Sequence, residues 1–182
     1  KYVSSWPSRM RTENDEYSWQ NDVSLPLGRA MLALERFEQK APLGSDASSE
    51  ESIAINSAVA AWSANLGLHR WQLSARHDQH STFGGQDTYA LAYGYQISPE
   101  WRAHASLGTA FKAPSLYQLF DPYSGNATLE PEKGRNREAA IVWERGQQSA
   151  SLTYYYNRVR NLIDWVPTDS WGGRYINVGK AH

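Results

Sequence analysis

Polar and apolar side chains alternate with a period of two along most of this chain, and this alternation limits the folds open to it. Between positions 69 and 157, one set of alternate residues is mostly apolar or aromatic, and the residues between them carry most of the formal charges. A period of two is the periodicity of a β-strand, whose successive side chains point to opposite faces of a sheet. Helical periodicity is weak by comparison. The sequence therefore predicts an all-β fold.

The alternating segments predict nine or ten strands. They cover residues 16–25, 29–39, 52–64, 69–78, 87–97, 101–111, 137–145, 149–159 and 162–166, with another strand from about 173 onward. Tight turns rich in Gly, Pro, Asn and Ser connect some strands, at 25–28, 65–68, 97–100 and 145–149. Longer links connect others, at about 40–51, 79–86 and 112–136. Short and long links alternate, which indicates an antiparallel up-and-down meander with one trimmed rim and one elaborated rim.

The two faces of these strands are compatible with two architectures. In a soluble sandwich the apolar face packs in a core, whereas in an outer-membrane barrel it meets lipid and the polar face lines the interior. Strands of about ten residues can cross a hydrocarbon layer at a tilt. The chain also has 8 Trp and 11 Tyr against 4 Phe, and aromatic side chains with one polar end suit a lipid–water interface. These features favour part of a large barrel, although alternation alone does not separate it from a sandwich.

The long link after residue 111 is the first candidate for a binding site. The strand ends at Lys112-Ala113-Pro114, because proline cannot donate a hydrogen bond to a neighbouring strand. Loops as long as the one that follows are commonly functional. Exposed aromatic rings in or near the elaborated rim could stack on a planar ligand; the alternative is that they anchor the chain at the membrane interface, which we favour for Trp165. The candidate ligand-binding residues are Tyr117, Phe120, Tyr123, Trp165 and Trp171.

Other chemistry finds little support in the sequence. The 18 Lys and Arg balance 19 Asp and Glu, so nothing indicates a nucleic-acid partner, and the absence of cysteine excludes disulfides and thiolate metal sites. His77 and His80 fall on opposite faces of a strand, which favours a polar rim loop over a metal site. Glu130 and Glu132 flank a proline, and nothing nearby would tune their protonation for catalysis. We expect no catalytic residues, no metal and no cofactor.

Several segments resemble TonB-dependent outer-membrane transporters. The segment ASLGTAFKAPSLYQLF, followed by NATLEPEKGRNREAAI, resembles a strand and loop of that family. The segments WQLSARHDQHSTFG, YYYNRVRNLIDW and YINVGKAH are similar to further strands of it. The resemblance covers most of Trp19–His182 and is strongest to the cobalamin-transporting subgroup. The matching residues of the first two segments are Gly108, Thr109, Phe111, Lys112, Ala113, Pro114, Leu116, Asn126, Leu129, Pro131 and Glu132.

The resemblance implies a fold larger than this chain. Such transporters combine a plug domain and an N-terminal TonB box with a barrel of about 22 strands. Residues 1–182 would then be a fragment of the barrel, with the plug and the C-terminal strands absent. An open sheet leaves two unpaired edges, so we expect the isolated fragment to self-associate.

The resemblance also implies a function. The intact protein would be a receptor in the outer membrane of a Gram-negative bacterium that imports a scarce cobalamin-like or iron-chelate nutrient, driven by the TonB system, and it would not be an enzyme. The alternative is a soluble, lectin-like all-β binding module. In the transporter interpretation, the polar face meets the plug in the lumen. The residues expected there are Arg70, Arg76, Arg102, His104, Glu138 and Glu144.

Overall fold

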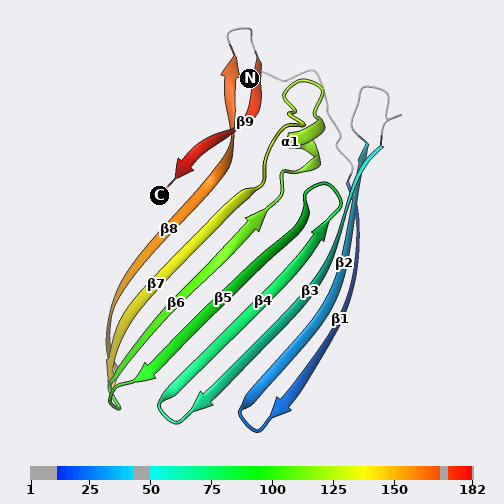
Figure 1. Ribbon diagram of the computed structural model, residues 1–182. Coiled ribbons are helices and arrows are strands. Elements are labelled where there is room, and N and C mark those ends of the chain that lie inside the picture. Colours follow the sequence, from blue (N-terminus) through cyan, green and yellow to red (C-terminus); the bar gives the residue numbers. More distant parts are fainter. Residues whose placement is uncertain (1–11, 43–49, 169–171, 182) are drawn as a thin grey trace.

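The predicted strands form one antiparallel sheet in which each strand pairs with the next along the chain (Figure 1). The structure is a computed structural model that describes residues 12–42, 50–168 and 172–181. Within these ranges the sheet has nine strands, open at β1 and β9. Their bounds are β1 Glu13–Leu25, β2 Gly28–Pro42, β3 Glu50–Leu66, β4 His69–His80, β5 Gly84–Gln96, β6 Trp101–Lys112, β7 Glu132–Arg145, β8 Gln148–Thr168 and β9 Gly172–Ala181, with a helix α1 at Leu116–Phe120.

The register between strands keeps the two predicted faces separate. Arg70 lies opposite Gly94, which lies opposite His104, and His104 lies opposite Ala140. Residues directly opposite one another share a face of the sheet, so this row belongs to one side. Trp71 and Tyr93 form a neighbouring pair on the other side. We call the first side the polar face and the second the apolar face.

The apolar face is not covered by other parts of the described chain. Leu34 is 58% exposed, Leu152 is 74% exposed and Trp19 is 55% exposed. The small hydrophobic core lies elsewhere, where Ala41, Ile53 and Leu116 pack together under the loop that contains α1. A soluble sandwich would cover the apolar face with a second sheet, whereas the described residues form a single sheet. This exposed apolar face is the arrangement expected of a barrel wall.

The structure corrects several predicted boundaries. The segments 149–159 and 162–166 are one continuous strand, β8, of 21 residues. It pairs with β7 as far as Arg160 and with β9 from Val159 onward. Asn161, at the point of this change, has φ 55°, a left-handed conformation that asparagine tolerates better than most residues. β2 and β3, at 15 and 17 residues, also exceed the predicted length.

The predicted alternation of short and long links is wrong at one position. β4 continues to His80 and β5 begins at Gly84, so the link predicted at 79–86 is a tight turn. The link predicted at 112–136 is long, but β7 already begins at Glu132 and the link contains α1. No helix of the described residues has the length and apolar content needed to cross a membrane.

The β1–β2 turn gives a test of the register. Gly28 has φ 108°, and a Cβ there would lie 2.1 Å from the Ser63 carbonyl oxygen on β3. Gly28→Ala in the intact protein is therefore expected to lower the free energy of unfolding by about 3 kcal/mol or more, because strain and a backbone clash add. Gly67→Ala is the control, since Gly67 also has a positive φ but no heavy atom within 4 Å of that position. Chemical denaturation in detergent should separate the two variants; equal losses would contradict the register.

The open sheet predicts the behaviour of the isolated chain. With two free edges and an uncovered apolar face, residues 1–182 alone should self-associate in buffer. Adding detergent should change the sedimentation coefficient, because detergent can cover the apolar face. A monomer in plain buffer that unfolds in one cooperative transition would contradict this expectation.

Candidate functional site

The loop between β6 and β7 is held in one conformation by a short capped helix. Pro114 is fully buried, and Ser115 caps α1 by accepting a hydrogen bond from the Gln118 backbone N–H at 3.2 Å. The Gln118 side chain accepts one from the Ser115 backbone N–H at 2.9 Å. This reciprocal pair is a capping box. The sequence pattern Ser-x-x-Gln is the signal from which this helix start could have been predicted.

The turn after α1 is fixed by Asp121. One carboxylate oxygen accepts hydrogen bonds from the Ser124 backbone N–H at 2.8 Å, the Ser124 hydroxyl at 2.7 Å and the Tyr123 backbone N–H at 3.2 Å. The turn requires glycine at position 125, because a Cβ there would lie 2.5 Å from the backbone of Asp121. The segment that presents Tyr123 is therefore ordered locally.

Asn126 joins this loop to the β8–β9 hairpin. Its amide nitrogen donates to the Tyr175 carbonyl oxygen at 2.8 Å. Its side-chain oxygen accepts from the Thr128 hydroxyl at 2.6 Å and from the Arg174 guanidinium at 3.1 Å. Asn126 is only 7% exposed, so these bonds are largely shielded from water. Figure 1 shows α1 and the β8–β9 hairpin at the same end of the sheet.

Two of the predicted aromatic residues present their rings at this rim. Tyr123 is 93% exposed. Tyr117 is 39% exposed and packs edge-on against Tyr175, with ring centroids 6.2 Å apart. Partial burial, together with the nearby Asp121 carboxylate, raises the pKa of the Tyr117 phenol. The phenol therefore remains neutral, and able to donate a hydrogen bond, at neutral pH.

The other three predicted aromatics have different positions. Phe120 packs against the small core of Ala41, Ile53 and Leu116, so it supports the loop more than it offers a free ring. Trp165 lies against the backbone of Gly173 on the β8–β9 hairpin, beyond the last residue of β8 that pairs with β7. That position favours a role at the rim over the anchoring role preferred from sequence. Trp171 lies outside the described residues.

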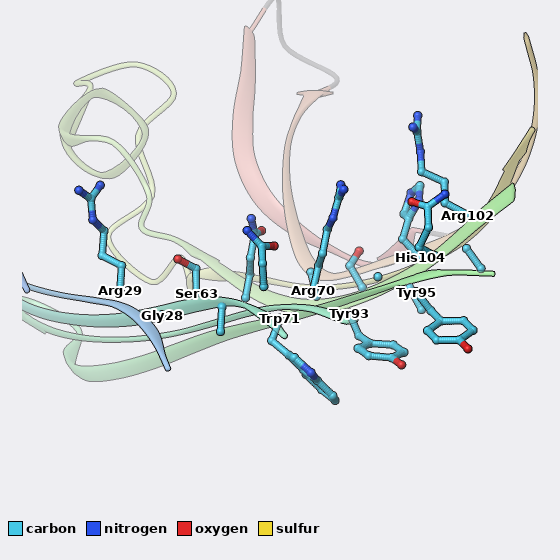
Figure 2. A pocket seen from close by; sticks show the side chains of 18 residues that line it. Gly28, Arg29, Ser63, Arg70, Trp71, Tyr93, Tyr95, Arg102 and His104 are labelled. Carbon is cyan, nitrogen blue, oxygen red and sulfur yellow. The ribbon is translucent and has the colours of Figure 1, made fainter. Parts of the chain in front are cut away.

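The predicted lumen residues lie together on the polar face. Figure 2 shows Arg70, Arg102 and His104 on one side of the sheet, opposite Trp71, Tyr93 and Tyr95. Arg29 lies on the same side as the three and was missed, because the face assignment in the sequence began only at residue 69. These residues border a shallow hollow of about 550 Å³ near the trimmed rim. The side chains of Arg29, Arg70, Arg102 and His104 all point away from the apolar face (Figure 2).

Two side-chain contacts connect members of the polar face. Arg102 makes two hydrogen bonds to Glu144, at 2.8 and 2.9 Å, and His104 lies 3.5 Å from Glu138. These contacts cross from β6 to β7, so they tie the two strands together. All four residues remain partly exposed, which leaves them available to a further partner.

Arg76 is the centre of a second polar network nearer the elaborated rim. Its guanidinium donates at 2.7 Å to Glu35, to Asp78 and to the Ser57 hydroxyl, and Ser57 donates to Asp78 at 2.5 Å. The network crosses β2, β3 and β4. Glu35 and Ser57 were missed from sequence for the same reason as Arg29.

The histidine pair that could have held a metal is divided between the faces. His77 is bound to Asp87 at 2.7 Å on the apolar side, whereas His80 is fully buried on the other. Both belong to β4, so the predicted rim loop is wrong here. Within the described ranges, no three His, Asp or Glu lie close enough to hold a metal ion. Glu130 and Glu132 accept hydrogen bonds from Asn161 and the Ile163 backbone, as expected of structural residues.

Comparisons with known proteins agree with this architecture. The family model described as TonB dependent receptor-like, beta-barrel, matches residues 9–182. The vitamin B12 transporter BtuB of Vibrio cholerae serotype O1 is 41% identical over 111 residues, which are 60% of this chain and 18% of the transporter. BtuB of Photobacterium profundum is 30% identical over 165 residues, 90% of this chain and 27% of that protein. The chain thus spans about a fifth to a quarter of these relatives.

Solved structures share the fold. The siderophore receptor PirA from Pseudomonas aeruginosa superposes with a TM-score of 0.83 at 24% identity, over 94% of this chain and 35% of the receptor. The ferric enterobactin receptor PfeA of the same organism, a Q482A mutant in complex with enterobactin, gives 0.75 at 22% identity, over 94% and 32%. At these identities the likeness concerns the fold alone. The soluble lectin-like alternative is excluded, and this chain belongs to the TonB-dependent receptor-like β-barrel family.

Proposed function

We propose that the protein containing this chain is an outer-membrane receptor that actively imports a scarce nutrient, either cobalamin-like or an iron chelate. The observation that carries the proposal is the ordered rim loop, which holds Tyr123 almost fully exposed above a sheet with one polar and one apolar face. The printed functions of the relatives, vitamin B12 transport and siderophore reception, support this class of ligand. Titration of the intact receptor with cyanocobalamin and with ferric siderophores tests the proposal, and no saturable binding of either would refute it.

The chemistry of the proposed site is binding. Tyr117 and Tyr123 offer aromatic faces at the elaborated rim, and aromatic rings bind planar groups with little loss of conformational entropy. The site residues of the rim loop are uncharged or already paired: Asp121, for example, is occupied by its own turn. No bond of the nutrient needs to break, so the proposed role requires no catalytic group.

The polar face is proposed to contact a plug domain in the lumen of the intact barrel. Arg70, Arg102 and His104 project from it (Figure 2). Arg70 has no ion-pair partner among the described residues, whereas Arg102 is paired with Glu144. Arg70 could therefore donate hydrogen bonds to a plug domain, and such bonds can break again when the plug moves. In this proposal the TonB system supplies the energy for that movement.

The apolar face is proposed to contact the hydrocarbon of a Gram-negative outer membrane. Outer-membrane barrels present apolar side chains outward and alternate them with lumen-facing polar ones. Leu34, Leu73, Leu107 and Leu152 are all substantially exposed in the chain by itself. Lipid would cover this surface in the intact protein.

Removing the most exposed ring tests the binding surface. Tyr123→Ala in the intact receptor should weaken nutrient binding by about two- to tenfold, because one aromatic stacking contact contributes about 0.5–1.5 kcal/mol. Tyr17→Ala is the matched control: Tyr17 is 65% exposed but lies on the apolar face of β1. Equilibrium binding should show a loss for the first variant only. Equal affinities for the two variants would remove Tyr123 from the site.

Removing the hydrogen bonds of Asn126 tests whether the ordered conformation of the β6–β7 loop contributes to nutrient binding. Asn126→Ala removes hydrogen bonds to Tyr175, Thr128 and Arg174, so the backbone amides of 121–129 should exchange with deuterium faster. Nutrient affinity should fall as well, since the loop must then be ordered on binding. Asn136→Ala on the polar face of β7 is the control. Unchanged exchange in the Asn126 variant would show that the helix cap and the Asp121 turn suffice to hold the loop.

A further inference from the structure

Five cations form a cluster on the apolar side of β7 and β8, at the end nearer the elaborated rim. They are Lys133, Arg135, Arg137, Arg158 and Arg160. The register places Lys133 opposite Arg160 and Arg135 opposite Arg158. Lys133, Arg135, Arg137 and Arg160 are exposed and Arg158 is half-buried. We refer to these residues as the basic row.

We propose that the basic row binds the phosphate groups of lipid headgroups in the outer leaflet of the membrane. The inference rests on the proposed outer-membrane function, since it requires lipid against this face. The bound species would be a lipid with its acyl chains along the apolar face and its phosphates against the cations. The argument depends on position, charge and the lack of another partner.

The position of the basic row follows from the strand pattern. Along the same face of β7, Trp143, Ile141 and Ala139 come first from the trimmed rim, and Arg137, Arg135 and Lys133 follow. On β8 the partners are Ala150, Leu152 and Tyr154, then Tyr156, Arg158 and Arg160. The change from apolar to basic therefore occurs within one residue pair on the two strands. If the acyl chains of a lipid lie against the apolar residues of β7 and β8, its headgroup lies against the basic residues.

None of the five cations forms an ion pair with a carboxylate of the described residues. The apolar side of β6, β7 and β8 carries no Asp or Glu between 101 and 160. Like charges directly opposite one another destabilise a sheet, so the pairs Lys133–Arg160 and Arg135–Arg158 are unfavourable without an anion. Two other pairs of charged groups on this face do have partners: Arg36 is bound to Glu38, and His77 to Asp87.

Arg158 gives a second, independent observation. Its Nε is buried and makes no hydrogen bond, although a buried donor without a partner is costly. It borders a groove of about 220 Å³ with Lys133, Arg135, Arg160 and Asp87. The Asp87 carboxylate is already bound to His77 at 2.7 Å. The groove forms where β5 and β6 separate, since their pairing stops at Ala90 and Gly108. An anionic oxygen in this groove would meet donors from both β7 and β8.

Removing two members of the basic row tests the proposal. The probe is lipid A with both phosphates, added to the intact receptor in neutral detergent and quantified by native mass spectrometry. Arg135→Gln/Arg158→Gln should weaken binding by about 25-fold, because each cation near an anionic lipid surface contributes roughly a factor of five. Arg36→Gln/Lys40→Gln, which changes two cations of the same face on β2, should leave binding within about twofold.

Further arms identify the chemistry that is recognised. Dephosphorylated lipid A should bind the wild-type receptor at least tenfold more weakly, and millimolar inorganic phosphate should not displace the lipid. Equal binding of the two lipids, equal affinities of the two double variants, or displacement by free phosphate would overturn the proposal. Nutrient binding is measured on the same samples: if it persists while the lipid result fails, only the headgroup site is wrong. If nutrient binding is absent from the wild type, the proposed function fails separately.

Discussion

Backbone hydrogen bonding between neighbouring strands is the constraint on which the rest of the structure depends. In hydrocarbon every N–H and C=O must find a partner within the protein, and a sheet whose strands pair in sequence order achieves this. Once the register is fixed, side-chain direction follows, because a shift of one residue would exchange the two faces. The row Arg70–Gly94–His104–Ala140 and the pair Trp71–Tyr93 are consequences of this register. The exposed apolar face and the polar network around Arg76 both follow from this register.

The sequence predicted the faces correctly because alternation is a direct record of side-chain direction. Arg70, Arg102 and His104 project to the side opposite Trp71 and Tyr93 (Figure 2), as their parity indicated. The same rule, extended to residues before 69, would have found Arg29 and Glu35. The single meander and the family were also available from sequence, since turns such as Asn65–Leu68 and the segment around Lys112–Pro114 carry local signals.

Strand ends and the loop were harder to predict, for identifiable reasons. Beyond the apolar band both faces of a strand meet water, so alternation fades while backbone pairing continues, as in β8 after Arg160. Two separate strands were predicted at 149–159 and 162–166, yet the left-handed Asn161 between them allows one strand to exchange β7 for β9 as its partner. The helix at Leu116–Phe120 is too short for a periodic signal, and only its capping residues could have predicted it. The bonds of Asn126 to the hairpin depend on contacts 48 and 49 residues apart.

The rim loop and the basic row are mechanically connected through the start of β7. The Glu132 carboxylate, only 8% exposed, accepts a hydrogen bond from the Ile163 backbone at 2.9 Å and binds the Lys112 ammonium at 3.2 Å. It therefore joins β6, β7 and β8 where the loop begins. Lys133, the next residue, opens the basic row on the other face. A headgroup held by the basic row would fix the height of β7 and β8 in the membrane, and with it the height of the loop and of Tyr123. In this arrangement the lipid-facing side positions the nutrient-facing side without any direct contact between them.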